Sequence, residues 1–126
     1  MILLDYPYAS DFLLQTIIEN KFPVIATKEA KQIGGNKDIN WMAEEDAARI
    51  LKDNPHTPIY TNSENSISWI QQNTQGTDLP EIIDLFKNKY KFRNLIKTAY
   101  PDYFFEAIAA ENLRSMDVSG FKFPFI

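Results

Sequence analysis

The chain has 126 residues, 44% of them hydrophobic and 13% aromatic, and this composition indicates one folded domain with a real core. It contains no cysteine and one histidine, His56, which excludes disulfides, thiolate chemistry and a zinc site. No window approaches the ~20 apolar residues that a transmembrane helix needs. Residues 1–5 lack the basic lead of a signal peptide. We therefore expect a soluble cytoplasmic protein.

The net charge of −4 is unevenly distributed along the chain. Residues 1–83 contain six basic and twelve acidic side chains, whereas residues 84–101 contain five basic side chains and one acidic one. A basic island on an acidic protein indicates an anionic ligand, an acidic partner or a solvated helix face. Its aromatic residues fall at the helical spacing of a core, so we expect no nucleic-acid partner.

Residues 1–27 are predicted to form a β–α–β unit. Residues 2–4 are a continuous apolar run, as in a strand buried on both faces of a parallel sheet. Ser10 is a suitable N-cap for a helix that continues to about residue 20 with apolar residues at i, i+4 spacing. Residues 22–27 then form a second strand, reached by a right-handed crossover.

Residues 28–77 are expected to contain a loop, a helix, a strand and a short second helix. Residues 28–40 are assigned to a loop after one helical turn, and Gly34-Gly35 is not a phosphate-binding fingerprint. Asn40 is assigned as the N-cap of a helix over residues 41–53. A strand over residues 59–61 follows, then a polar turn and a helix that contains residues 67–70.

The remaining residues begin with a strong helix start, in which Asp78 is the N-cap and Pro80 lies in the first turn. The apolar stripe shifts near Asn88, so we expect two helices or one kinked helix up to Pro101. Residues 103–107 are predicted to be a strand, residues 111–116 a short helix and residues 121–126 a second strand.

Polar loops follow the first strand and the strand over residues 59–61. The carboxyl ends of neighbouring parallel strands meet at one edge of a sheet, and this edge is where open α/β sheets bind ligands. The side chains could also only cap helices and close turns; Asn62, for example, could cap the helix after it. The candidates for a site at this edge are Asp5, Tyr6, Tyr8, Ser10, Thr61, Asn62, Ser63, Glu64 and Asn65.

Four segments occur in an order that is similar to one protein family. They are Asp5-Tyr6-Pro7-Tyr8-Ala9-Ser10, Tyr60-Thr61-Asn62-Ser63-Glu64-Asn65, Phe86-Lys87-Asn88-Lys89 with Phe92-Arg93, and Phe123-Pro124-Phe125-Ile126. Together they resemble the amino-terminal part of ATP-grasp enzymes, which join a carboxylate to an amine or a thiol through an acyl phosphate. The resemblance covers nearly the whole chain.

The resemblance implies an α/β fold: a Rossmann-like pre-ATP-grasp domain over residues 1–77, with a short parallel sheet flanked by helices. Residues 78–126 would then be linker helices and the incomplete start of an ATP-grasp domain. It implies that Lys89 contacts nucleotide phosphate, with Arg93 or Lys87 as weaker candidates, and that the edge loops form a substrate-side pocket. It also implies that the complete enzyme uses ATP, Mg²⁺ and a small-molecule carboxylate.

The catalytic parts of the family come after Ile126 by this comparison, so we expect no catalytic centre, no metal site and no bound cofactor in this chain. Its acidic run, Glu44-Glu45-Asp46, occupies the first turn of a predicted helix and is expected to face water. The chain would be the inactive front end of a ligase. The alternative is a non-catalytic α/β binding or interaction module that uses the same loops.

The two expected strands near the end of the chain carry five phenylalanines within residues 103–126. A two-stranded piece is marginally stable in water, and its open edge can pair with another chain. The segment can either fold back on the first domain or pair with a second copy of itself, and we expect the second, a homodimer formed through these strands.

Overall fold

Residues 1–7, 9–103, 105, 107–117 and 119–120 are described by the structure, which is a computed structural model. The chain divides into two compact units, Met1–Lys87 and Asn88–Ile126, and each is described by itself.

The first unit is built on a parallel four-stranded sheet with strand order β3-β2-β1-β4. The strands are β1 (Ile2–Leu3), β2 (Val24–Ile25), β3 (Trp41–Met42) and β4 (Tyr60–Thr61). Ile2 pairs with Val24 on one side and with Tyr60 on the other, so β1 is a central strand. The chain adds strands on one side of β1 and then crosses to its other side, so the direction of strand addition reverses between β1 and β4. The expected α/β class with a short parallel sheet is confirmed.

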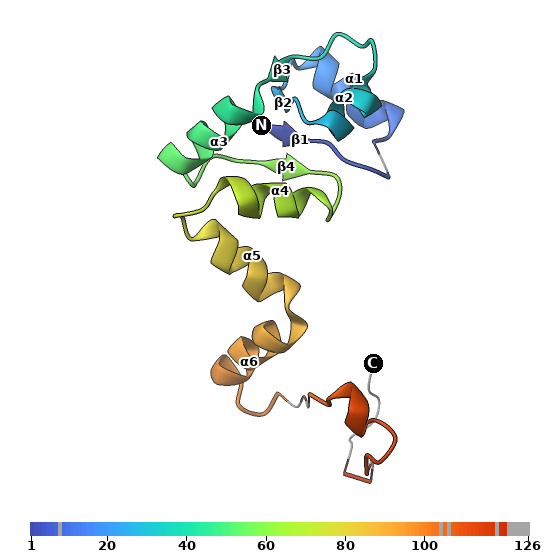
Figure 1. Ribbon diagram of the computed structural model, residues 1–126, viewed down its shortest axis with the longest axis vertical. Helices are drawn as coiled ribbons and strands as arrows, with labels where there is room; N and C mark the ends of the chain where they lie inside the picture. The colour runs from blue at the N-terminus through green and yellow to red at the C-terminus, as the bar shows by residue number, and fades with distance from the viewer. Residues whose placement is uncertain (8, 104, 106, 118, 121–126) are drawn as a thin grey trace. The chain divides into compact units, whose positions relative to one another are not determined.

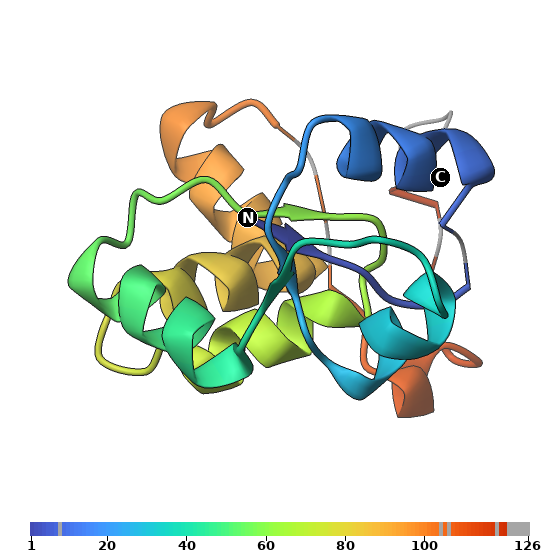
Figure 2. The same cartoon turned by 90° about the horizontal axis from the view of Figure 1, so that it is seen from above.

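Five helices accompany this sheet, and Figure 1 shows them in chain order. They are α1 (Asp11–Glu19), α2 (Lys28–Gly34), α3 (Glu44–Asp53), α4 (Ser66–Asn73) and α5 (Leu79–Lys87). Figure 2 shows α1 on one side of the strands and α3 and α4 on the other. Ser10 caps α1 as expected, because its hydroxyl accepts the backbone N–H of Leu13 at 3.2 Å.

Alternate residues of the strands pack into separate apolar clusters, as the pleat of a strand requires. Ile2, Leu4 and Val24 belong to a cluster with residues of α1 and α2. Leu3 and Ile25 belong to a second cluster with Ala47 of α3 and Ile70 of α4. Residues 2–4 are all buried, which confirms that β1 is covered on both faces. The ends of the strands are thereby held in fixed positions.

The sequence interpretation of residues 28–53 was wrong in two places. Residues 28–34 form α2, whose N-cap is Thr27, and residues 41–42 form β3 rather than the start of a helix. The helix α3 begins at Glu44 after Ala43, so Asn40 is not its cap. Trp41 is in a strand because it packs against the first apolar cluster, and this tertiary contact outweighs the local helical pattern.

The first compact unit continues past residue 77, where the sequence comparison placed a domain boundary. The helix α5 packs against α4, and Ile83 of α5 packs against the cluster that contains Leu3. The division therefore falls after Lys87. The boundary at residue 77, which the family resemblance implies for this chain, stays a prediction.

The second unit begins with α6 (Lys89–Ala99) and also contains a short 3₁₀ helix, η1 (Ala110–Asn112). Asn88 separates α5 from α6, so the structure has two helices, the first of the two expected alternatives, rather than one kinked helix. Tyr103, Phe105 and Ala107 are not in a strand, and the helix expected over residues 111–116 is shorter and lies earlier. The strand expected over residues 121–126 lies outside the described residues.

None of the helices in the described part of the chain has the length and apolar composition needed to cross a membrane.

Candidate functional site

The loops after β1 and β4 are joined by the side chain of Asn62. Its Oδ1 accepts the backbone N–H of Asp5 at 2.9 Å, and its Nδ2 donates to the backbone carbonyl of Asp5 at 2.7 Å. Asn65 adds a longer bond, in which Nδ2 donates to the carbonyl of Tyr6 at 3.4 Å. The expectation that the two loops meet at the carboxyl edge of the sheet is confirmed. Asn62 is not the cap of α4, because the N-cap position is Asn65 and the Asn62 amide pairs with the backbone of the loop after β1.

Thr61 and Ser63 hold the turn after β4 in shape. The Thr61 hydroxyl donates to the carbonyl of Ser63 at 2.9 Å and accepts its N–H at 3.2 Å, and the Ser63 hydroxyl accepts the N–H of Asn65 at 3.2 Å. Glu64 is exposed. The described contacts of these residues are those of turn closure, the simpler of the two interpretations that the sequence allowed.

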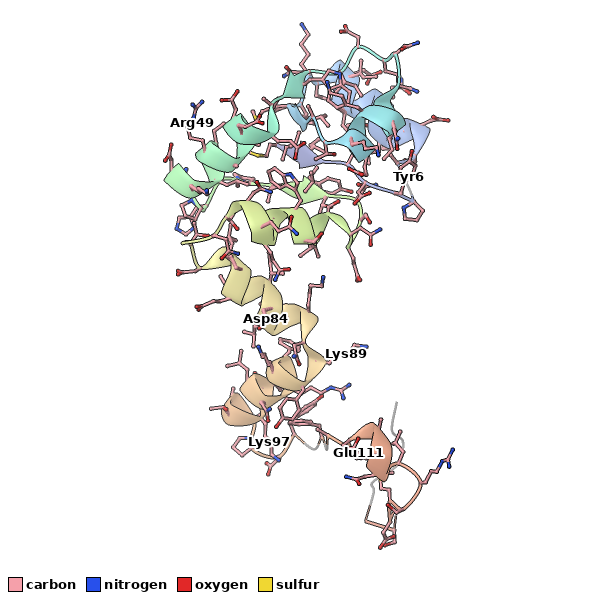
Figure 3. The ribbon with its side chains drawn as sticks, viewed as in Figure 1. Tyr6, Arg49, Asp84, Lys89, Lys97 and Glu111 are labelled. Atoms are coloured by element: carbon pink, nitrogen blue, oxygen red, sulfur yellow. The ribbon has the colours of Figure 1, made fainter. Side chains whose placement is uncertain are left out.

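Tyr6 and Tyr8 were also named as candidates from the sequence. The Tyr6 hydroxyl donates to Oε1 of Gln32, in α2, at 3.3 Å, and Figure 3 labels Tyr6 on the loop after β1. Tyr8 lies outside the described residues. The loop after β1 therefore contacts both the turn after β4 and α2.

A cavity of about 400 Å³ opens beside this loop, at the carboxyl ends of β1 and β2 and the start of α4. Its walls from the strands and α2 are Leu3, Leu4, Asp5, Thr27 and Glu29. Its walls from α4 and the residue before it are Asn65, Ser66, Ser68, Trp69 and Gln72. A cavity of this size lies within the range of small-molecule sites. It also adjoins the position where the strand order reverses, which is the usual ligand position in open α/β sheets.

Ser66 has an unusual environment among the residues that line the cavity. The residue is only 3% exposed, and its buried hydroxyl has no hydrogen-bond partner among the described residues. A buried polar group without a partner is rare in folded proteins, and it often marks a place where a missing ligand or water completes the bonding. The Ser66 hydroxyl is therefore the strongest local sign of a binding site.

Trp69 forms one wall of the cavity in a fixed orientation. Its indole Nε1–H donates to Oε2 of Glu44 at 2.6 Å, which connects α4 to the first turn of α3. The sequence interpretation that Glu44 only faces water was therefore wrong, although Glu45 and Asp46 are exposed as expected. Asp46 forms an ion pair with Arg49 at 2.7 Å.

One cavity residue, Glu29, was missed from the sequence because residues 28–40 were assigned to a loop. Thr27 is a good N-cap residue, and Glu29 lies in the first turn after it, which together are a helix-start signal. That signal would have predicted α2 and brought Glu29 to the edge of the sheet. Ser66 ends the polar run of residues 61–66, which the sequence predicts to be a wall of a site, but its burial depends on tertiary packing and could not be predicted.

The other candidate residues, Lys89 and Arg93, lie one turn apart on α6 in the second unit. Figure 3 shows Lys89 near the start of α6 and Lys97 near its end. Asn88 caps this helix by accepting the N–H groups of Tyr90 and Lys91, each at 3.1 Å. Lys87 lies at the end of α5 in the first unit. Lys89 is exposed, and its ammonium makes no hydrogen bond or ion pair in the described contacts. This ammonium is therefore available to bind an anion.

Two groups with shifted pKa values lie away from the cavity. Burial lowers the pKa of the Met1 ammonium below its ordinary value of 8.0, and this ammonium donates to the carbonyl of Pro58 at 2.9 Å. The backbone N–H of Ser119, and then its hydroxyl, lower the pKa of the Asp117 carboxyl below 3.8. Neither Met1 nor Asp117 lines the cavity, so neither pKa shift affects its chemistry.

Comparisons of the chain with known protein families, with curated proteins and with solved structures give no match. Within the described residues no cluster of three or more histidine, aspartate or glutamate side chains could hold a metal ion.

Proposed function

We propose that this chain is the substrate-side domain of an ATP-dependent ligase of the ATP-grasp type, which joins a carboxylate to an amine or a thiol. The observation that supports this most is the cavity at the carboxyl edge of the sheet, beside the loops that Asn62 joins. Its size suits a small organic substrate. The chain by itself holds the substrate without converting it.

A role in nucleotide binding is proposed for Lys89 and Arg93. Residues four apart on a helix lie on the same face, so both side chains can reach one phosphate group. The phosphate groups of ATP are therefore the anions that we assign to Lys89 and Arg93 on α6. The described residues offer no cluster of carboxylates for Mg²⁺, so no step of the reaction is assigned to this chain.

Binding in the cavity can be tested with Trp69 as the reporter. The chain contains two tryptophans, so Trp41→Phe leaves Trp69 as the single indole. We expect small carboxylates and amines at millimolar concentration to change its emission, and Ser66→Ala to weaken this response. Glu45→Gln is a matched control, because Glu45 is exposed and does not line the cavity. No response to any small ligand would contradict the proposal.

The ligase part has separate tests. We expect the chain to show no ATP hydrolysis, because one or two cations without a Mg²⁺ site cannot stabilise the transition state of phosphoryl transfer. Magnesium-dependent turnover that is lost in Lys89→Ala would contradict this. A reading frame that continues after the codon for Ile126 into a lysine-bearing strand and a glycine-rich loop would support the ligase assignment.

A binding module without chemistry is the second candidate, and one observation favours it. The cavity is formed within the compact unit Met1–Lys87. Ligand binding by the chain together with a stop codon directly after Ile126 would favour this module over the ligase.

We also propose self-association through residues 103–126, because five phenylalanines lie in this segment. Sedimentation of the full chain beside a version that ends at Lys87 tests this. We expect only the full chain to form a dimer, and monomers for both would contradict the proposal. Lys87 is the better endpoint than residue 77, since it keeps α5 on the core.

A further inference from the structure

We infer that the cavity binds an amine that also carries a hydrogen-bonding oxygen. This inference rests on the proposed function, and it identifies which of the two ligase substrates this chain would hold: the amine that is acylated rather than the carboxylate. Three features of the cavity support it: its charged side chains, the unpartnered Ser66 hydroxyl and its apolar wall.

The charged side chains of the cavity favour a cation. Asp5 and Glu29 line it, and no lysine, arginine or histidine is among the described residues that do so. A carboxylate ligand would meet two like charges there without a compensating cation. An ammonium group would instead form charge-assisted hydrogen bonds with either carboxylate. The sign of the charge therefore selects the amine over the acid.

The start of α4 favours a negative or partly negative group of the ligand, and this preference is weaker than that of the two carboxylates for a cation. Its eight residues, Ser66–Asn73, present roughly half a positive charge at the helix N-terminus. This partial charge does not outweigh two carboxylates, but it favours an oxygen of the ligand at the α4 side of the cavity. The ligand is therefore oriented, with its ammonium toward Asp5 and Glu29 and its oxygen toward Ser66.

Ser66 supplies the independent sign of a ligand. Ser66 is one of the residues that line the cavity, and its buried hydroxyl, just beneath the cavity surface, has no partner among the described residues. A hydroxyl both donates and accepts, so an alcohol, a carbonyl or a carboxylate oxygen of the ligand would satisfy it. Leu3 and Trp69 form apolar surface in the same cavity and suit a short carbon chain between the two polar ends.

Three small probes of similar size separate the alternatives. We would titrate the full chain, labelled with ¹⁵N, with 2-aminoethanol, glycolate and ethylene glycol at constant ionic strength. Each probe carries a hydroxyl group, and they differ in bearing an ammonium, a carboxylate or no charge. We expect 2-aminoethanol to shift the amide signals of Asp5, Glu29 and Ser66, and to bind at least tenfold more tightly than the other two.

Matched variants test the contacts. Asp5→Asn and Glu29→Gln should each weaken binding of 2-aminoethanol about tenfold, since each removes one charge-assisted bond of about 1.4 kcal/mol. Asp53→Asn is the control, because Asp53 is an exposed carboxylate at the end of α3 and does not line the cavity. Equal weakening in Asp53→Asn would mean that only the net charge matters, which would overturn the inference.

Ser66→Ala distinguishes a ligand contact from a structural role. Removing a buried hydroxyl that has no partner should leave the thermal midpoint of the free protein unchanged or raise it. The same change should weaken 2-aminoethanol binding several-fold. A lower midpoint together with unchanged binding would overturn the role of Ser66.

The remaining outcomes separate the two proposals. Preference for glycolate would overturn the amine inference and leave the proposed substrate-binding function in place. No shift of the cavity amides with any of the three probes would overturn both.

Discussion

The two compact units place their apolar side chains in opposite ways. In Met1–Lys87, Leu4, Ile25 and Leu51 are fully buried, and the sheet carries an apolar cluster on each face. In the described part of residues 88–120 no helical residue is buried, and Tyr90 and Leu95 are more than half exposed. Both α3 and α6 are amphipathic in sequence. An amphipathic pattern therefore predicts a helix, whereas burial also requires a surface to pack on.

The two units consequently depend on different interactions. Met1–Lys87 is stabilised by the removal of apolar surface from water. The second unit depends on local contacts. The ring of Phe105 lies 6.1 Å from that of Tyr90 in an edge arrangement and 6.3 Å from that of Tyr103. The Lys97 ammonium lies 5.6 Å from the Phe105 ring. Such contacts contribute little when exposed.

The largest expected effect comes from a pair of leucines in helices of the two units. Leu51→Ala in α3 should cost about 2–5 kcal/mol of unfolding free energy, because the residue is fully buried and leaves a cavity. Leu95→Ala in α6 should change it by less than about 0.5 kcal/mol, because this side chain is half exposed. Urea unfolding followed by far-UV circular dichroism checks both variants. Equal losses would mean that α6 is buried against a partner in solution.

The next largest loss of stability is expected from replacing one asparagine in each unit by alanine. Asn62→Ala should cost about 1–3 kcal/mol, since it leaves the N–H and carbonyl of Asp5 without their partner. Asn88→Ala removes the cap of α6 and should cost that helix about 0.5–2 kcal/mol. Tryptophan fluorescence reports the first unit alone, because both tryptophans lie in it.

The control for Asn62→Ala is Glu64→Ala in the same turn, which should be nearly silent because Glu64 is exposed. For Asn88→Ala we expect lower helicity with an unchanged fluorescence transition. A shifted fluorescence transition would show that the two units unfold together, and it would weaken the contrast between them.

Replacing one glycine in each unit by alanine tests how tightly side chains pack around it. A Cβ at Gly34 would lie 2.7 Å from Cδ1 of Ile39 and 2.9 Å from ring atoms of Trp41. Such overpacking costs about 1–3 kcal/mol, and the helix gains about 0.5–1 kcal/mol from replacing glycine. Gly34→Ala should therefore lose up to about 2.5 kcal/mol in urea unfolding. Gly120→Ala should be nearly neutral, because no atom of the described residues lies within 4 Å of the position that its new methyl group would take. Stabilisation by Gly34→Ala would mean that Trp41 moves aside at little cost.

Local patterns predicted most of the first unit. The buried run at residues 2–4 and the Ser10 cap each depend on neighbouring residues, and both were predicted correctly, as was the break at Asn88 where the second unit begins. Trp41 could not be assigned to β3 in this way, because its strand forms by pairing with β2. This pairing is a contact with a distant part of the chain, and the periodicity of nearby residues cannot predict it.

The candidate site was predicted in part for the same reason. The meeting of the loops after β1 and β4 follows from strand order, and the structure confirms it through Asn62 and Asp5. The cavity also needs Glu29 and Ser66, which come from helices whose positions depend on packing. Residues on strand ends are therefore easier to predict from the sequence than residues on the helices that face them.

The smallest expected effect lies in the exposed turn at Asp117, in the second unit. Its carboxylate accepts the backbone N–H of Ser119 at 2.9 Å, and this bond, together with the Ser119 hydroxyl, lowers its pKa below 3.8. A lowered pKa means that the turn is stabilised while the carboxylate is ionised. The stabilisation is present above the pKa of the unfolded chain and is lost as the pH falls through the lower, folded value. An NMR titration of the Asp117 carboxyl should therefore have its midpoint below 3.8. Ser119→Ala should move the midpoint only part of the way back, because the backbone N–H remains, and a full return would assign the whole shift to the hydroxyl.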